Sequence, residues 1–296
     1  MFSAITLVTC AAFRIVDHIL LNLRATLRSI TNPVVLSAIT GVLSVAPCTL
    51  SAQTAGSRTR IVDSLPGQRL RWELVAVPAG DVTVPGPDGP VRVAVEPFLI
   101  GTTELLWELY DVFYLRLDVP RDERARVDAT SRPSRPYGAP DRGFGHRGWP
   151  AISLTHGAAV KFAAWLSEKT GQRYAVASDA QWQRALDVAL ASPTPDAVDR
   201  VAWHATNADA ATHASSTREA DALGLFDLLG NAAEWVTGQD GTPLMRGGSY
   251  LSPRDSLAVL RQRQLPSWNQ TDPQDPKSRW WLSDGPFAGV RLVRIP

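Results

Sequence analysis

Glycine and proline interrupt this chain so often that a loop-rich fold is favoured over a bundle of long helices. There are 21 glycines and 22 prolines among 296 residues, and both residue types end helices and strands. Residues 119–150 form one Pro-, Arg- and Gly-rich stretch, and loops of that length in compact domains usually have a function. All ten tryptophans lie at or after Trp72, so large aromatic side chains build either the core or a binding surface.

Alternation of apolar and polar residues predicts strands early in the domain. The period of two in residues 72–76 indicates a strand that ends at Pro78. Residues 82–84 and 91–95 repeat this period around a Pro- and Gly-rich turn at residues 87–90. That arrangement predicts a β-hairpin or a short meander.

Three helices follow from spacing and capping residues. Thr103 is placed to cap a helix that continues to Phe113, with apolar residues on one face. A second helix is expected from about residue 157 to residue 170, where Gly171 supplies a left-handed stop. A third begins at Ser178, because a glutamine three positions later completes a capping box.

The N-terminal part of the chain is typical of a secretory signal. Residues 33–50 are uncharged and apolar, follow two arginines and precede a run of small residues. We therefore expect residues 1–52 to be a signal peptide, with a start that is over-extended upstream, and residues 53–69 to be a linker. A spanning helix is the rival interpretation, since about 18 apolar residues reach the lower limit for a bilayer. The protein is expected to be exported, and to be membrane-anchored only if this segment is not cleaved.

Cysteine usage and net charge exclude several classes of protein. Both cysteines, Cys10 and Cys48, precede residue 53, so the domain contains no disulfide and no thiolate metal ligand. The formal net charge of +1 gives no reason to expect a nucleic-acid partner, and cleavage of the signal would leave no membrane-inserted segment.

One familiar site motif is not supported by the sequence around it, and a second is absent. Residues 143–148 match Gly-x-Gly-x-x-Gly, but a Pro/Arg loop precedes them and Trp-Pro follows, so the strand and helix that hold a dinucleotide are missing. We interpret this segment as a glycine-flexed surface loop. No two histidines of the domain are four residues apart in a His-Glu-x-x-His motif, which argues against a zinc hydrolase.

Several segments, in chain order, resemble the formylglycine-generating-enzyme (sulfatase-modifying factor) family. The Gly-Asn-x-x-Glu-Trp and Arg-Gly-Gly-Ser segments are the most specific, and the resemblance covers about residues 70–296. It implies a single α+β domain of the C-type-lectin-like kind with sparse regular secondary structure. The matching segments are Ile-Gly-Thr-Thr-Glu at 100–104, Trp-Pro-Ala-Ile-Ser-Leu at 149–154, Ser-Asp-Ala-Gln-Trp at 178–182, residues 223–235, Met-Arg-Gly-Gly-Ser-Tyr at 245–250 and the terminal residues 287–294.

The resemblance also implies a structural calcium ion. The family's ligand positions match Asp227, Gly230, Ala232 and Glu234, where family members often carry Asn in place of Asp227. A hard cation prefers six to eight oxygen ligands, and a glycine turn can aim backbone carbonyls inward. Without the resemblance, both carboxylates would be read as ordinary turn and capping residues.

The same resemblance places the family's catalytic centre where this chain lacks the required residues. Aligned on Gly-Gly-Ser-Tyr, the two cysteines that hold copper(I) fall at Ser252 and Leu257. Copper(I) is soft and selects thiolates, so neither copper nor formylglycine-generating oxidase activity is expected. A divergent enzyme reusing the pocket near Arg246, Ser249, Ser252 and Arg254 is the alternative.

A tryptophan-rich segment near the C-terminus suggests a binding surface. Trp268, Arg279, Trp280 and Trp281 lie in a distinctive loop and offer stacking faces and positive charge for a sugar or a peptide. The competing interpretation is that these tryptophans fill a loop-rich core. The resulting prediction is an exported, calcium-stabilised binding or scaffold domain whose partner is a protein, a peptide or a glycan.

Overall fold

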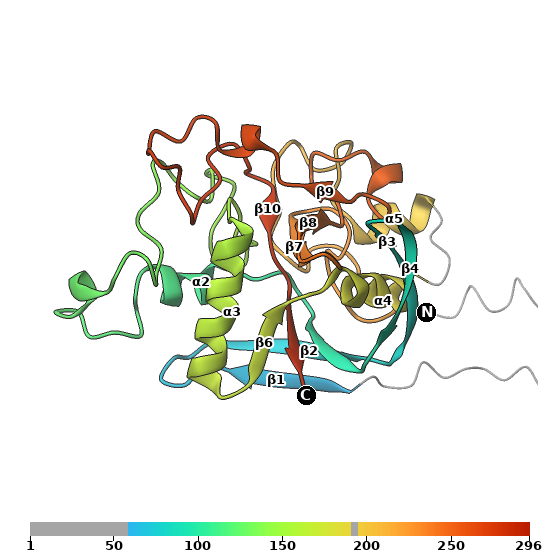
Figure 1. Ribbon diagram of the computed structural model, residues 1–296, viewed down its shortest axis with the longest axis horizontal. Helices are drawn as coiled ribbons and strands as arrows, with labels where there is room; N and C mark the ends of the chain where they lie inside the picture. The colour runs from blue at the N-terminus through green and yellow to red at the C-terminus, as the bar shows by residue number, and fades with distance from the viewer. Residues whose placement is uncertain (1–58, 191–194) are drawn as a thin grey trace, which may run out of the picture. The chain divides into compact units, whose positions relative to one another are not determined.

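The computed structural model describes residues 59–190 and 195–296 (Figure 1). The signal peptide expected over residues 1–52 lies outside these ranges. Within the described residues, no helix combines the length and the apolar character needed to cross a membrane.

A five-stranded antiparallel sheet forms one side of the main core. Its order is β1-β2-β5-β11-β6, so the last strand of the chain pairs between two strands that precede it by more than 100 residues. The expected strand at residues 72–76 is confirmed as part of β2. The strands are β1 (Arg60–Ser64), β2 (Arg71–Val77), β5 (Phe98–Gly101), β11 (Leu292–Ile295) and β6 (Arg173–Val176).

The expectation of a linker over residues 53–69 is wrong from Arg60 onward. Residues Arg60–Ser64 form β1, which pairs with β2 in the register Arg60↔Val75. The strand is short and largely exposed, so its sequence carries little hydrophobic signal, and it is held mainly by backbone pairing.

The expected hairpin is confirmed. β3 (Gly80–Gly86) and β4 (Gly89–Val95) pair antiparallel and place Val82 opposite Val93. A second, four-stranded sheet is built from the C-terminal third of the chain in the order β10-β7-β8-β9. Its strands are β10 (Ala288–Gly289), β7 (Ala233–Thr237), β8 (Pro243–Arg246) and β9 (Gln262–Arg263).

Two of the three expected helices have the expected ends. α3 (His156–Thr170) is capped by Thr155 and ends at Gly171, whose φ of 69° is left-handed. α4 (Asp179–Ala189) begins with the capping box of Ser178 and its partner glutamine. The remaining helical segments are α5 (Pro195–Val201) and the 3-10 turns η2 (Arg124–Arg126), η3 (Arg254–Ser256) and η4 (Pro266–Asn269).

The expected cap at Thr103 is wrong, because α2 spans Trp107–Tyr114 and its N-cap is Leu106. The chain before it stays extended: the Leu105 N–H donates to the Val290 carbonyl, and Leu106 bridges to Pro150. The backbone of Leu105 and Leu106 is therefore hydrogen-bonded to distant segments. It is not part of the helix that the apolar spacing predicted there.

The tryptophans near the C-terminus lie in the core. Trp268, Trp280 and Trp281 are only 6, 3 and 4% exposed. Trp280 and Trp281 pack with aromatic residues of α2, and Trp268 packs with Trp235 and Phe287. The expectation that their rings form an open stacking surface is therefore wrong, and the core-filling interpretation holds. A chain with few long helices buries its apolar area through such large rings.

Candidate functional site

Arg246 holds β8 against α4 and does not face an open pocket. Its guanidinium donates to the Asp179 carboxylate at 2.6 Å and to Gln183 Oε1 at 2.7 Å. The same group lies over the ring of Trp182, 4.3 Å from the centroid. Burial lowers the pKa of Arg246, while Asp179 opposes that effect. This buried arrangement is a packing contact between two elements.

The two serines of the candidate pocket stabilise a tight turn. Gly247 and Gly248 adopt left-handed φ values of 81° and 64°. The Ser249 N–H then donates to Ser252 Oγ at 3.0 Å, and Ser249 Oγ accepts from the Leu251 N–H at 3.2 Å. Both hydroxyls are thus engaged with the turn's own backbone.

The side chains at the two positions aligned with the family's cysteines, Ser252 and Leu257, both approach Gly248. A β-carbon built on Gly248 would lie 3.1 Å from Ser252 Oγ and 2.6 Å from Leu257 Cδ2. Leu257 is fully buried in a hydrophobic cluster that includes Trp182 and Leu228. The space at this point is therefore filled by an aliphatic side chain and a hydroxyl.

Arg254 belongs to a different group of side chains. It donates to Asp199 Oδ2 at 3.2 Å, and Asp199 Oδ1 lies 2.8 Å from His204 Nε2. The other ring nitrogen of His204 lies 3.1 Å from the hydroxyl of Thr206. The hydrogen bond with His204 lowers the pKa of Asp199. The four residues expected to share one pocket therefore lie in three places: Arg246 against α4, the two serines in the tight turn, and Arg254 beside Asp199.

This hydroxyl–imidazole–carboxylate chain is a grouping that sequence spacing did not reveal. It adjoins the Gly-Gly-Ser turn, because the Ala205 N–H donates to the Ser252 carbonyl at 3.0 Å. His204 is buried whereas Thr206 is exposed. An imidazole held by a carboxylate can accept a proton from a hydroxyl. His204 therefore has the hydrogen-bond partners that a general base requires.

Three buried carboxylates surround a single buried guanidinium. The Glu234 oxygens accept from Arg291 Nε at 2.8 Å and from Trp182 Nε1 at 2.7 Å. Glu104 accepts from the Ala232 N–H at 3.1 Å and from Asn231 Nδ2 at 3.2 Å. Arg291 also donates to the carbonyls of Gly101 and Phe226, so these contacts tie both sheets together.

Asp227 is the third carboxylate of this group. Its Oδ2 accepts from the hydroxyl of Ser215 and from the Ser216 N–H, while its Oδ1 is buried and has no hydrogen-bond partner. Burial raises the pKa of Asp227, Glu104 and Glu234, and the other two carboxylates raise that of Glu104 further. A group with this excess of negative charge is stabilised by a proton or a cation.

Two of the residues expected to bind calcium keep acceptor sites that no protein donor occupies. Asp227 offers an unpartnered oxygen, and each oxygen of Glu234 keeps a second acceptor site beside its N–H partner. Gly230 has a left-handed φ of 78°, and a β-carbon there would collide with the Trp203 backbone. Within residues 59–190 and 195–296, no three His, Cys, Asp or Glu side chains are arranged to hold a metal, so backbone carbonyls such as those of Gly230 and Ala232 are needed.

The tryptophan segment forms a groove, although its rings are buried. Trp280 Nε1 donates to the Ala129 carbonyl at 3.0 Å, and Trp281 Nε1 donates to the Ser134 carbonyl at 2.8 Å. A groove of about 500 Å³ lies between these segments. Arg279 is exposed on it, and its guanidinium has no hydrogen-bond or ion-pair partner in the described part of the chain. Of the four expected binding residues, Arg279 is the one that carries a charge, and after the hydrogen bonds from Thr130 it helps to lower the pKa of Asp128.

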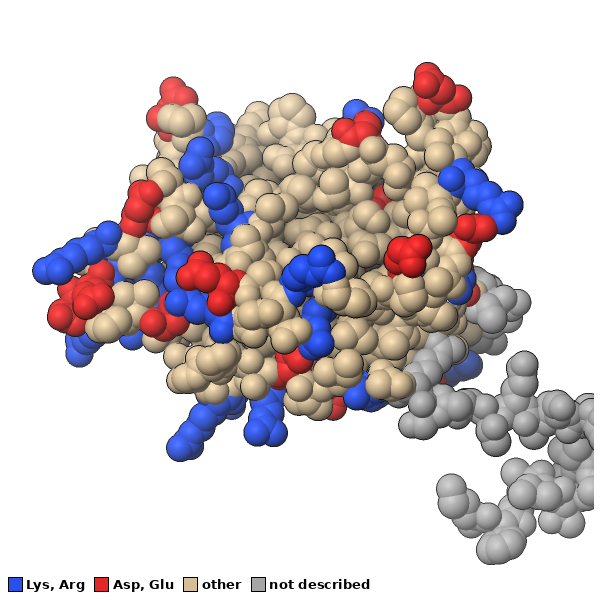
Figure 2. Space-filling view, turned by 60° about the horizontal axis from the view of Figure 1, so that its bottom comes forward, with Lys and Arg blue, Asp and Glu red and all other residues tan. Residues whose placement is uncertain are grey.

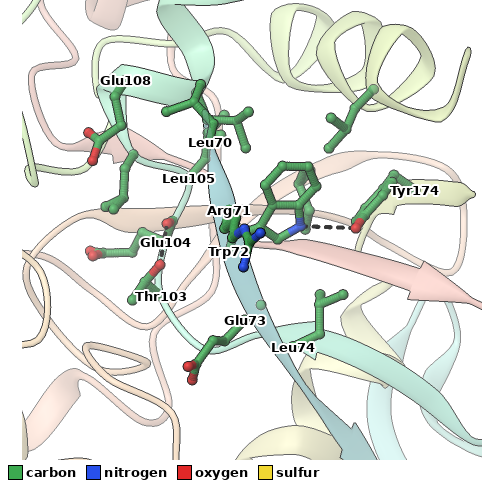
Figure 3. A pocket seen from close by; sticks show the side chains of 15 residues that line it. Leu70, Arg71, Trp72, Glu73, Leu74, Thr103, Glu104, Leu105, Glu108 and Tyr174 are labelled. Atoms are coloured by element: carbon green, nitrogen blue, oxygen red, sulfur yellow. Dashed lines mark hydrogen bonds between the residues drawn. The ribbon is translucent and has the colours of Figure 1, made fainter. Parts of the chain in front are cut away.

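A separate apolar pocket of about 70 Å³ lies between the five-stranded sheet and the helices α2 and α3 (Figure 3). Trp72 crosses it and donates from its indole nitrogen to the Tyr174 hydroxyl at 2.9 Å. Sequence reasoning did not predict this pocket. Its wall is largely leucine, contributed by Leu70, Leu74, Leu105, Leu106, Leu109, Leu166 and Leu292.

Charged side chains of both signs are interspersed on the face drawn in Figure 2, and much of its middle is uncharged. Some exposed charges of the domain are paired, as in the Arg92–Asp81 bridge at 2.6 Å.

Comparisons with known proteins agree with the fold. The sequence profile described as the sulfatase-modifying factor enzyme 1-like domain matches residues 64–294, whereas no curated protein sequence matches the chain. Treponema denticola variable protein 1 is 17% identical with a TM-score of 0.57, covering 81% of this chain and 100% of that one. PvdO from Pseudomonas aeruginosa is 21% identical with a TM-score of 0.55, covering 76% and 94%. CarF is 19% identical with a TM-score of 0.52, covering 76% and 98%.

Proposed function

The chain belongs to the sulfatase-modifying factor family, and from that premise we propose that it is an exported, calcium-stabilised binding domain without formylglycine-generating oxidase activity. The α+β fold is that of the family's structural neighbours. Those neighbours share no more than 21% identity with the chain, so they support the fold alone.

The observation that carries the proposal is the pair of residues above Gly248. The family's oxidase needs two thiolates there, and this chain has Ser252 and the buried Leu257. No cysteine exists between residue 53 and the C-terminus to replace them. A hydroxyl and an aliphatic side chain provide no soft ligand for copper(I).

A direct assay tests the absence of oxidase activity. The purified mature protein is incubated with copper, oxygen and a peptide containing Cys-x-Pro-x-Arg, and the peptide is weighed by mass spectrometry. We expect the cysteine to remain unchanged. A mass shift corresponding to formylglycine would refute this part of the proposal.

The binding role is proposed for the groove beside Arg279. Its exposed guanidinium can bind a sulfate or a carboxylate through two parallel N–H groups, in competition with the carboxylates of Asp128 and Asp275. Lys277 lines the same groove, although its ammonium is engaged with the carbonyls of Gln270 and Asp272. The ligand class that fits is an anionic glycan or an acidic peptide.

A glycan array with sulfated and unsulfated pairs tests this assignment. We expect binding to the sulfated members that weakens in Arg279→Ala and with rising salt. Arg173→Ala is a matched control: Thr155 at the start of α3 contacts the Arg279 carbonyl, whereas exposed Arg173 follows the far end of that helix, about 22 Å away. Equal binding by wild type and Arg279→Ala would contradict the assignment.

Export is proposed from the N-terminal sequence. The mass of the protein recovered from outside the cytoplasm of its host should correspond to a chain that begins close to residue 53. Recovery of the full-length chain from the membrane fraction would favour an uncleaved anchor.

A second candidate function is a divergent hydrolase, and the Asp199–His204–Thr206 chain favours it. In this mechanism Thr206 attacks an ester carbonyl while His204 accepts its proton, and His204 returns that proton to the alcohol as the ester C–O bond breaks. Water then hydrolyses the acyl-threonine ester, which frees the acid and restores the hydroxyl. A fluorophosphonate reagent tests it by labelling an activated hydroxyl. Modification of Thr206 that disappears in His204→Gln would support the enzyme, and an unlabelled wild type would eliminate it.

A further inference from the structure

His146 lies between two aspartates on the surface of the domain. Its Nε2 is 2.8 Å from Asp111 Oδ2, and its Nδ1 is 2.9 Å from Asp141 Oδ2. Asp111 belongs to α2, whereas Asp141 and His146 belong to the segment of residues 141–148, which includes the glycine-flexed loop of residues 143–148. The imidazole therefore joins this segment to the helix.

Both contacts can be hydrogen bonds only when His146 is protonated. A neutral imidazole has one N–H, so its other nitrogen would direct a lone pair at a carboxylate oxygen. The imidazolium donates from both nitrogens and forms two charge-assisted bonds. The ring of Trp107 is stacked on it, with the centroids 4.9 Å apart and the planes inclined by 16°, an arrangement that also favours the cation.

The segment held by this contact reaches the Gly-Gly-Ser turn. Phe144 packs edge-on against Tyr250, the residue that follows Ser249, with ring centroids 5.5 Å apart. At the other end of the segment, the Gly148 N–H donates to Glu108 of α2 at 3.0 Å. Arg142 of the same segment also donates to Ser153 Oγ and to the carbonyls of Leu282 and Ser283. The attachment to α2 is thus one of the contacts that position Phe144 over Tyr250.

We propose that His146 is a pH-dependent latch: protonated, it fixes residues 141–148 to α2 and keeps Phe144 on Tyr250, and deprotonated, it releases both. The inference rests on the geometry of the two aspartates and does not require the proposed binding function or any enzyme activity.

The groups around His146 favour the protonated form. Partial burial lowers the pKa of His146, and the hydrogen bonds and charges of Asp111 and Asp141 outweigh it, so that the pKa is raised above 6.5. Glu108 is the other acidic group of α2 beside this contact, and Trp107 is uncharged. Because the folded-state pKa is raised, the latch is complete below about pH 6.5 and is lost as the pH rises through the raised value.

Hydrogen exchange measured by mass spectrometry on the full chain tests the latch. Peptides covering residues 141–148 are followed from about pH 5.5 to about pH 8.5, after correction for the intrinsic pH dependence of exchange. We expect exchange of this segment to become about tenfold faster at the alkaline end, the factor that corresponds to losing one charge-assisted hydrogen bond. Protection that stays constant over this range would overturn the proposal.

Variants separate the latch from a general effect of pH. His146→Gln should exchange rapidly at every pH, while the matched control His156→Gln, on α3, should keep the wild-type profile of the segment. In NMR titrations, Asp111→Asn and Asp141→Asn should each lower the pKa of His146. A His146 titration unchanged in both variants would overturn the latch even if the segment proved mobile.

Discussion

Leu257 lies directly against Gly248, so close that a β-carbon on the glycine would be 2.6 Å from Leu257 Cδ2. Ser252 approaches the same point, with its Oγ 3.1 Å away. The side chains at the two positions that align with the family's cysteines therefore meet at Gly248. This chain lacks the two sulfur atoms at these positions, and substitution can introduce them.

We predict that Ser252→Cys/Leu257→Cys binds copper(I), because two thiolates at these positions supply the soft ligands that the metal selects. Competition with a copper(I) chelator measures the affinity. Ser252→Ala/Leu257→Ala is the matched control: it makes a similar cavity, destabilises the protein by about 3 kcal/mol and should bind no copper. Equal copper binding by the two variants would contradict the prediction.

The buried Arg291–Glu234 pair should contribute strongly to stability. Arg291→Met leaves Glu234 without its cation and leaves the carbonyls of Gly101 and Phe226 without donors. We expect a loss of about 4 kcal/mol in the free energy of unfolding, measured with urea. The control is Arg92→Met in the exposed Arg92–Asp81 pair, which should cost less than about 1 kcal/mol.

Whether a helix or strand could be predicted from the sequence depends on how far apart in the chain its contacting residues lie. The ends of α3 and α4 were predictable because Gly171 and Ser178 act on their own helices. The start of α2 was not, because Leu105 pairs with Val290 near the opposite end of the chain. Local capping signals therefore succeed where no distant strand competes for the same backbone.

The candidate site was also predictable only in part, because local segments can be recognised in the sequence whereas contacts between distant segments cannot. The family's segments indicated Asp227 and Glu234, but the partner of Glu234, Arg291, lies on a separate segment and became apparent only in three dimensions. Tryptophan spacing likewise cannot tell a core ring from a surface ring, and Trp280 proved to be buried. His146 meets Asp111, 35 positions away, and Asp141, five positions away, and no local sequence pattern encodes that meeting.

Calcium should stabilise the domain through Asp227. We expect the melting temperature to rise on adding calcium and to fall with a chelator, since an ion that binds only the folded state stabilises it. Asp227→Ala should abolish most of the shift by removing both side-chain oxygens, including the unpartnered one. The control Asp240→Ala, in a pair with Arg263, should retain it. Identical melting curves with calcium and with chelator would remove the ion from the proposal.

Acid should weaken the attachment of the 119–150 loop through Asp118. Burial alone would raise the pKa of Asp118, but hydrogen bonds from Arg132, Lys169 and Trp165 lower it well below 3.8. Its contribution is therefore complete above about pH 3.8 and is lost as the pH falls towards the depressed value. We expect Asp118→Asn to cost about 3 kcal/mol at neutral pH, and the difference from wild type, measured by urea unfolding, should shrink on acidification. A difference that stays constant below pH 3.8 would show that the carboxylate's charge is not what holds Arg132.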